Sequence, residues 1–220
     1  MDYQFHWTPV LANLPAMLAG CLVTIQITVL SIVGGVALGL LLMLARSGKR
    51  GVASFLAQCW VEVARNTPAL FQIYMIYFGL GSVGLHLSSF VALLTGITFN
   101  NAGYLSETFR GGLTAIPETQ VRAARSLGMT SAQSFRYIVL PQLLRIVYYP
   151  TVNQMVWAIL MTALGLTVGM DTDLAGVTQN FNVLTYRTFE YFSVAAVLYY
   201  LVVKLMMASA RLLAYRMFRY

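Results

Sequence analysis

Long apolar blocks alternate with short polar or basic segments along the chain of 220 residues. Each block is long enough to cross the hydrocarbon core of a bilayer as a helix, which takes roughly 20 residues. The pattern predicts an all-α integral membrane protein, a single transmembrane domain over residues 1–220 with five transmembrane helices. The expected spans are residues 18–45, 53–80, 88–112, 150–169 and 191–213.

The composition supports the bilayer as the solvent of this chain. Hydrophobic residues make up 59% of the sequence and charged residues 10%, whereas soluble domains carry about 25% charged residues. Five spans leave no stretch for a soluble catalytic or nucleotide-binding domain. We therefore expect a chain that is not an enzyme and holds no cofactor, so that any ATP-driven work depends on a partner.

The formal net charge of +7 is distributed in a way that indicates topology and not nucleic-acid binding. Basic residues cluster after the first apolar block, around one central polar segment and at the end of the chain, and Arg187 is the clear exception. Such alternation follows the positive-inside rule. It places the N-terminus outside and the C-terminus in the cytoplasm. The clusters contain Arg46, Lys49, Arg50, Arg110, Arg122, Arg125, Arg136, Arg145, Lys204, Arg211, Arg216 and Arg219.

Cysteine, histidine and the N-terminal segment offer little chemistry. Cys21 and Cys59 lie in or beside apolar spans, which is typical of small packing residues and not of a disulfide. His6 and His86 have no Cys or acidic neighbours at metal-ligand spacing, so no metal site is expected. The N-terminal segment lacks a basic stretch and carries Asp2, which indicates a retained first span and not a cleaved signal.

The second apolar block is interrupted by Glu62, Arg65 and Pro68. Glu62 and Arg65 are three positions apart, so on a helix they share a face and are expected to neutralise each other. Pro68 removes one helical hydrogen bond and predicts a kink. Charged groups inside a membrane favour a translocation pathway, but a purely structural ion pair explains the same pattern, and the sequence leaves both open.

Small and amide side chains mark contacts between the spans. Gly34, Gly35 and Gly39 permit the close approach of a neighbouring helix. The amides could hydrogen-bond a zwitterion or join helices, and for each residue alone we favour helix packing; they are Gln72, Asn100, Asn101, Asn153 and Gln154. Outside the membrane, Asp171 and Asp173 are expected in a solvated loop, with contact to a binding protein as the alternative.

The polar segment at residues 115–141 predicts two short cytoplasmic helices joined at Gly128. The first begins at Pro117 and places Val121, Ala124 and Leu127 on one face. Thr130 and Gln133 fit a capping box for the second helix, which Leu140 and Pro141 are expected to end. The pattern fits either docking in a groove of another protein or an amphipathic loop on the membrane surface.

The same segment resembles the coupling loop of ABC importer permeases, in which Glu-Ala-Ala is followed by a Gly and then by Ile-x-Leu-Pro. The run Arg65–Gln72 resembles a signature of the polar amino-acid branch of that family, the histidine-, glutamine-, glutamate- and arginine-type permeases, and Gly103–Gly112 resembles the run before its loop. The similarity extends from about Asn13 to Tyr215. The matching loop residues are Ala123, Ala124, Gly128, Ile138, Leu140 and Pro141.

The resemblance implies a type I ABC importer permease in the bacterial cytoplasmic membrane. Implied partners are a cytoplasmic ATPase dimer that binds ATP and Mg, an extracytoplasmic amino-acid-binding protein and a second related permease. The coupling residues would be Arg122, Ala123, Ala124, Leu127, Gly128 and Met129. The expected substrate pathway contains Glu62, Arg65, Gln72, Asn153 and Thr162, and Glu107, Arg110 and Pro141 would support the loop.

Two departures from the family pattern affect these expectations. Arg122 stands where the family has Glu, so the ion pair to the ATPase must differ. Leu160 and Ala163 replace the Lys and the Ser of the family's Lys-Asp-Thr-Ser, which favours pairing with a second, different permease. A structural subunit that binds no substrate stays possible, and a self-sufficient secondary transporter is disfavoured because no internal repeat is visible. The sequence does not identify the amino acid.

Overall fold

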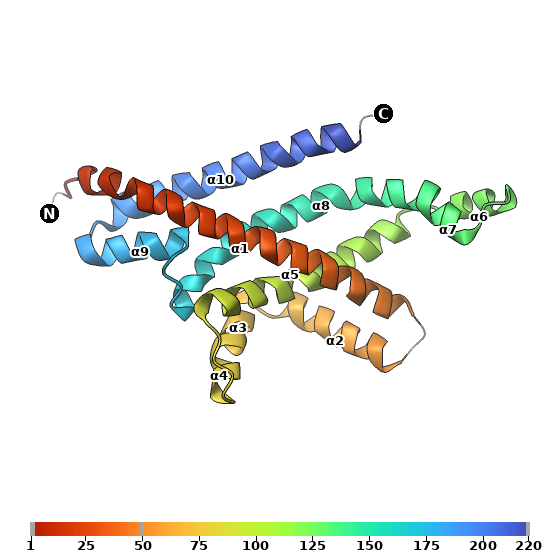
Figure 1. The fold of residues 1–220 in the computed structure, drawn as a ribbon, viewed down its shortest axis with the longest axis horizontal. Helices are drawn as coiled ribbons and strands as arrows, with labels where there is room; N and C mark the ends of the chain where they lie inside the picture. The colour runs from red at the N-terminus through yellow and green to blue at the C-terminus, as the bar shows by residue number, and fades with distance from the viewer. Residues whose placement is uncertain (1–2, 49–50, 219–220) are drawn as a thin grey trace.

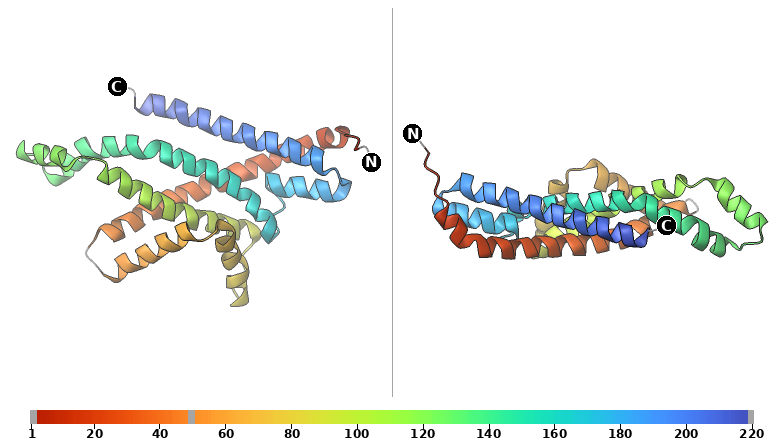
Figure 2. Two further views of the ribbon diagram at one scale, coloured as in Figure 1. Left: turned by 180° about the vertical axis from the view of Figure 1, so that it is seen from behind. Right: turned by 90° about the horizontal axis from the view of Figure 1, so that it is seen from above.

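The structure is a computed structural model that describes residues 3–48 and 51–218. Four residues used above to predict the topology and the N-terminal segment lie outside these ranges: Asp2, Lys49, Arg50 and Arg219. All regular structure in the described ranges is helical. Figures 1 and 2 show a thin, elongated bundle with the N-terminus at one end and the short helices α6 and α7 projecting at the other.

Helix α1 (Thr8–Ser47) and helix α5 (Ser89–Thr114) form the central pair of the bundle. The first apolar block therefore begins its helix at Thr8, ten residues before the predicted start of the span. A Cβ on Gly35 would lie 2.7 Å from Asn101 Cβ, and one on Gly34 would lie 2.9 Å from Thr98 Cγ2. The prediction that these small residues permit close approach is confirmed, and the neighbour is α5.

The expected continuous span over residues 53–80 is broken in the structure. Helix α2 (Val52–Asn66) ends before Thr67, whose extended backbone (φ −119°, ψ 148°) leads into Pro68. A proline disfavours the helical conformation of the preceding residue, so the chain turns instead of kinking gently. Helix α3 (Ala69–Tyr74), a π-type turn (Met75–Gly79) and helix α4 (Leu80–Ser82) continue in a different direction (Figure 1).

Two prolines expected to limit helices lie inside a continuous helical stretch. After α6 (Glu118–Ser126) and α7 (Ser131–Ser134), a π-type turn (Phe135–Val139) leads directly into α8 (Leu140–Met161). Pro141 lies in the first turn of α8, where its missing N–H is tolerated, so it does not end the preceding helix. Pro150 lies inside α8, so the helix that carries the expected span 150–169 begins ten residues before this proline.

The last third of the chain contains a helix where a loop was expected. A 3-10 segment (Thr162–Val168) follows α8, and Gly169 (φ +76°) ends it. Asp173 then caps helix α9 (Leu174–Thr185), accepting hydrogen bonds from the N–H groups of Gly176 (3.1 Å) and Ala175 (3.3 Å). Asp173 is fully buried, so the solvated-loop prediction is wrong for it, whereas Asp171 is exposed.

Helix α10 (Thr188–Met217) completes the bundle. Apolar clusters follow the length of α1, the first against α9 and α10, the second at mid-length against α5 and α8, and the third against α5 and α8 near its C-terminal end. Among the described residues, three helical stretches are long and apolar enough to cross a membrane: Thr8–Ser47, Ser131–Val168 and Thr188–Met217. A shorter apolar stretch is Ala69–Ser82.

Candidate functional site

The break between α2 and α3 is filled by amide side chains. Gln72 lies within hydrogen-bond distance of three acceptors through Nε2: the carbonyl of Ala64 (3.0 Å), the carbonyl of Thr67 (3.1 Å) and the hydroxyl of Thr67 (3.0 Å). Asn100 on α5 donates to the same Ala64 carbonyl and to Gln72 Oε1, both at 3.1 Å. These amides satisfy carbonyls that the helix loses at Pro68, so both serve helix packing.

A cavity of about 500 Å³ opens at this break, between Thr67 and Pro68, α3, α5 and α8. Its size is in the range of small-molecule sites. Gln154 reaches from α8 to Asn101, donating to its Oδ1 at 3.0 Å, and Asn101 Nδ2 is buried without a hydrogen-bond partner. The cavity therefore combines amide groups with aromatic rings. Its lining residues are Thr67, Pro68, Ala69, Asn100, Tyr104, Gln154, Trp157 and Met161.

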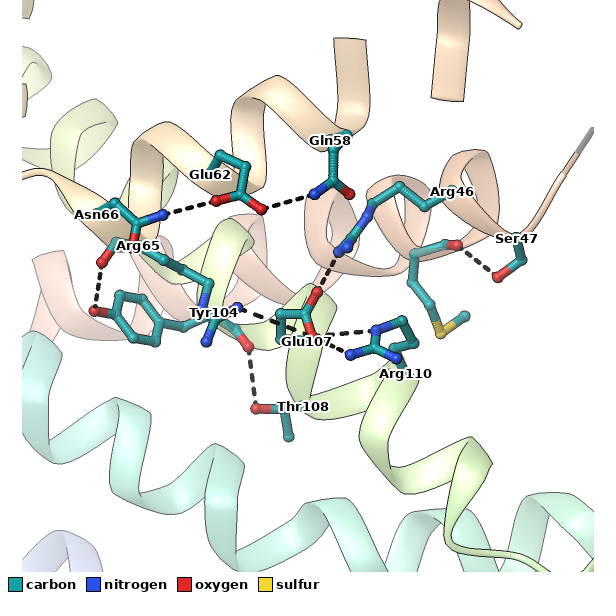
Figure 3. Close-up of polar contacts among 11 residues, drawn as sticks. Arg46, Ser47, Gln58, Glu62, Arg65, Asn66, Tyr104, Glu107, Thr108 and Arg110 are labelled. Carbon is teal, nitrogen blue, oxygen red and sulfur yellow. Dashed lines mark hydrogen bonds and ion pairs between the residues drawn. The ribbon is translucent and has the colours of Figure 1, made fainter. Parts of the chain in front are cut away.

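The five predicted pathway residues do not line this cavity. Glu62 accepts hydrogen bonds from Gln58 and Asn66 along the exposed surface of α2 (Figure 3). Arg65 turns instead toward Glu107, at 3.9 Å, so the predicted Glu62–Arg65 pair is wrong. The reason is tertiary, because α5 places a second carboxylate beside Arg65 that the local spacing does not reveal.

The remaining pathway candidates have different environments. Gln72 fills the helix break, and Asn153 is exposed on α8. Thr162 is fully buried and donates to the Ile159 carbonyl of its own helix at 2.8 Å. Sequence reasoning missed Tyr104 and Trp157 as lining residues, although a tryptophan in the middle of an apolar helix was an available signal.

Glu107 is the centre of an arginine cluster near one end of the bundle (Figure 3). Its carboxylate contacts Arg46 at the end of α1 and Arg110 one turn further along α5 (2.7 Å), and it faces Arg65 of α2. The Glu107 side chain is 17% exposed. One acid thus joins three helices, which is more than the predicted contact within a single helix turn.

Arg65 also connects this cluster to the cavity. Its guanidinium lies over the ring of Tyr104, with 5.9 Å between Cζ and the ring centroid. The Tyr104 hydroxyl donates to the Arg65 carbonyl at 3.4 Å. Because Tyr104 lines the cavity, one side chain joins the arginine cluster to the cavity wall.

The projecting hairpin of α6 and α7 has the local structure that its sequence predicts. Gly128 has φ +88°, and its N–H and that of Met129 bond to the carbonyls of Arg125 (3.1 Å) and Ala124 (3.2 Å). The capping box of Thr130 and Gln133 is present and confirms that prediction. The helix end at Gly128 is therefore set by a left-handed backbone that favours glycine.

Some side chains of this hairpin are buried and others are exposed. Ala124 is buried, whereas Leu127 is 84% exposed at the tip and does not share its face. Arg122 and Ala123 are also exposed, and Arg122 pairs with Glu118 of the same helix at 2.7 Å. Gln142 of α8 donates to Gln120 of α6 at 2.7 Å and ties the hairpin to the bundle.

Similarity to known proteins covers almost the whole chain. Residues 35–219 match the family model described as binding-protein-dependent transport system inner membrane component. The glutamine transport system permease protein of Escherichia coli (strain K12) is 31% identical over 216 residues, which are 97% of this chain and 98% of that protein. The octopine transport system permease protein of Rhizobium meliloti is 33% identical over 207 residues, 90% and 82% of the two chains.

A solved structure shares the fold. The crystal structure of an amino acid ABC transporter with histidines superposes with a TM-score of 0.90 at 28% sequence identity, covering 97% of this chain and all of the matched chain. The family match over residues 35–219 lies inside the part of the chain that is similar to these proteins. The chain belongs to the family of binding-protein-dependent transport system inner membrane components.

Proposed function

We propose that this chain is the permease subunit of an ATP-driven importer that moves a polar amino acid across the bacterial cytoplasmic membrane. The superposition on an amino acid ABC transporter over 97% of the chain is the observation that carries the proposal. The names of the glutamine and octopine permeases support an amino acid or a derivative as the substrate. This chain forms or breaks no bond in the solute.

The proposed topology has five spans, with the N-terminus outside and the C-terminus in the cytoplasm. To within one residue, the expected spans 18–45, 88–112, 150–169 and 191–213 coincide with parts of α1, α5, α8 with its 3-10 continuation, and α10, while the broken stretch α2–α4 supplies the second. The end of α1, the hairpin of α6 and α7 and the end of α10 lie toward one side (Figure 1). Basic residues gather there, which supports the cytoplasmic assignment.

The cavity beside Pro68 is the proposed binding site of the substrate. The amide group of Gln154 suits the charged groups of an amino acid, and the rings of Tyr104 and Trp157 suit its aliphatic part. Trp157 is 62% exposed on the surface of the single chain. A second, related permease would cover this face and contribute the charged groups that Leu160 and Ala163 lack.

The hairpin of α6 and α7 is the proposed contact with a cytoplasmic ATPase dimer, which binds ATP and Mg. Exposed Leu127 suits an apolar pocket, and Arg122 suits an acidic group on the ATPase. The Gln142–Gln120 hydrogen bond and the arginine cluster around Glu107 link the hairpin to the bundle and the cavity. An extracytoplasmic binding protein would deliver the substrate from the other side.

The test is purification of the tagged chain in mild detergent with its partners, followed by subunit stoichiometry and ATP-dependent uptake in proteoliposomes. We expect two ATPase subunits, this chain and a second permease. Gln154→Leu should raise the KM for the amino acid at unchanged ATPase content, while Gln58→Leu on the exposed surface of α2 should not. An assembly without an ATPase would overturn the proposal, and unchanged KM for Gln154→Leu would remove the cavity from it.

A further inference from the structure

The C-terminal half of α10 is loosely packed in this chain. Beyond Val202, Ala214 is the one residue of α10 that is buried. Lys204, Leu205, Leu212 and Leu213 are exposed. The helix lies along α8 and α1 (Figures 1 and 2), and cavities lie along its inner face.

Two cavities occupy this space and join end to end. One, of about 420 Å³, lies between α1, α5, α8 and α10 and extends to Phe218. The other, of about 380 Å³, lies between α1, α8 and α10 and extends to Ile25. Met155, Met206 and Ser209 line both. Together they form one groove along α10, which we name the α10 groove.

The hydroxyl groups in the α10 groove are already occupied. Tyr148 donates to the carbonyl of Ala210 (2.6 Å), Thr151 to that of Val147 (2.8 Å) and Ser209 to that of Leu205 (2.9 Å). Thr28 donates to the Thr24 carbonyl at 2.8 Å. The rest of the lining is aliphatic, aromatic or thioether, so the groove suits a flexible apolar chain and offers no donor to a polar solute.

One end of the groove is basic. The guanidinium of Arg145 on α8 lies over the ring of Phe218, with 5.9 Å between Cζ and the centroid. Arg216 is exposed in the last turn of α10, one turn beyond Leu213 of the lining. Basic groups beside an apolar space between helices on the cytoplasmic side attract anionic lipid head groups.

We propose that the α10 groove is a binding site for one anionic phospholipid of the inner leaflet. An acyl chain lies along Met155, Met206 and Ser209, and the phosphate head group lies at Arg145 and Arg216. The proposal relies on the cytoplasmic placement of this end proposed above. The lining is apolar, its hydroxyl groups are already hydrogen-bonded, and cations lie at one end only. This combination favours a lipid over a second protein helix, because an apolar helix surface would not require cations at one end of the groove.

The test is native mass spectrometry of the purified assembly, in detergent, with phosphatidylglycerol or phosphatidylcholine added. We expect one phosphatidylglycerol per chain to be retained preferentially. In the double variant Arg145→Gln with Arg216→Gln, the ratio of retained phosphatidylglycerol to retained phosphatidylcholine should fall by about 5-fold for each arginine removed. Ser209→Trp, which fills the groove, should abolish retention of both lipids. The charge control is Arg125→Gln with Arg136→Gln, and the bulk control is Ser193→Trp on the exposed surface of α10.

Several results would overturn the lipid site. Equal retention of the two lipids would do so, as would equal loss in Ser209→Trp and Ser193→Trp. The rival occupant, a protein helix, is tested with Met206→Cys in a chain without Cys21 and Cys59. Cross-linking of this cysteine to another protein chain in membranes would show that protein, and not lipid, fills the groove. Because lipid retention is measured without transport, its failure leaves the importer proposal standing, and a failure of uptake leaves the lipid result standing.

Discussion

At the scale of single residues, Glu107 concentrates the electrostatics of the bundle. A mostly buried carboxylate faces Arg46, Arg65 and Arg110, which come from three different helices. Pairing of this kind is costly to break from one side, because the remaining charges lose their partner in a poorly solvated place. Glu118, by contrast, meets Arg122 with both side chains more than two-thirds exposed.

Glu107→Gln should therefore destabilise the assembly. We expect a loss of about 2 kcal/mol, less than for a fully buried pair because the side chain is partly exposed, and a Tm lower by about 4–8 °C. Glu118→Gln, the matched exposed pair, should change the Tm by less than about 2 °C. Thermal unfolding in detergent measures both, and equal Tm values for the two variants would contradict the role of the cluster.

Asp173, which caps α9, is expected to make the stability of the protein depend on pH. Burial raises the pKa of its carboxyl above the usual value, although the N–H groups of Gly176 and Ala175 oppose the rise. A raised pKa in the folded state means that this group's stabilising contribution is present at low pH and is lost as the pH rises through the folded pKa. Asp173→Asn keeps an oxygen that can cap α9 but cannot ionise, so the stability of this variant should not fall as the pH rises.

The Tm of Asp173→Asn should accordingly equal or exceed that of the unsubstituted chain at pH 7, and the gap should close toward pH 4. Asp171→Asn, at an exposed position, serves as the control and should leave the curve of Tm against pH unchanged. A lower Tm for Asp173→Asn at pH 7 would show that the negative charge itself is needed.

At the scale of elements, the hairpin of α6 and α7 depends on one backbone angle. Gly128 has φ +88° with nothing within 4 Å of an added Cβ, so a substitution there changes conformation and not packing. A residue with a Cβ costs about 1–2 kcal/mol in this region. Gly111 of α5 has equally open surroundings but an ordinary helical backbone.

Gly128→Ala should reduce ATP-dependent uptake by roughly 5–30-fold, the effect of 1–2 kcal/mol placed on the docked hairpin. Gly111→Ala should leave uptake unchanged, because alanine is the better helix former. Uptake in proteoliposomes and ATPase content of the purified assembly separate coupling from assembly. Normal uptake with Gly128→Ala would argue against docking through this turn.

The elements also show which predictions the sequence supports. Gly128 and the Thr130–Gln133 capping box were predictable because their hydrogen bonds lie within a few residues. The tolerance of α8 for Pro141 depends on the π-type turn before it, and this turn has no sequence signature. The partner of Arg65 was not predictable, because α5 brings Glu107 to it from 42 positions away in the chain. The same holds for the cavity, whose walls come from three helices and the break before α3.

At the scale of the whole molecule, each end of the bundle exposes a leucine. The tip of α6 exposes Leu127, and the end of α9 exposes Leu184, each more than three-quarters accessible. Leu127 directly follows α6 and Leu184 lies in the last turn of α9, and Figure 1 shows these two helices toward opposite ends of the long axis. The proposed topology places the first in the cytoplasm and the second outside.

Single cysteines test this assignment. In a chain with Cys21 and Cys59 replaced by Ala, Leu184→Cys should react with an impermeant maleimide in intact cells, and Leu127→Cys should react only after the membrane is opened or inverted. Both should be labelled equally in a denaturing detergent that removes the partner subunits, which controls for the reactivity of the two cysteines. Labelling of both from the outside would exclude the five-span arrangement.

The length of α1 has a mechanical consequence. Its 40 residues extend about 60 Å, twice the hydrocarbon thickness of about 30 Å, and even a tilt of about 40° leaves it longer than the membrane is thick. Near its start Asn13 donates to Tyr191 at 2.8 Å, and near its end Arg46 contacts Glu107. Because one rigid helix carries contacts to α10 near its start and to α5 near its end, a tilt of α1 about its middle would displace these two contacts in opposite directions.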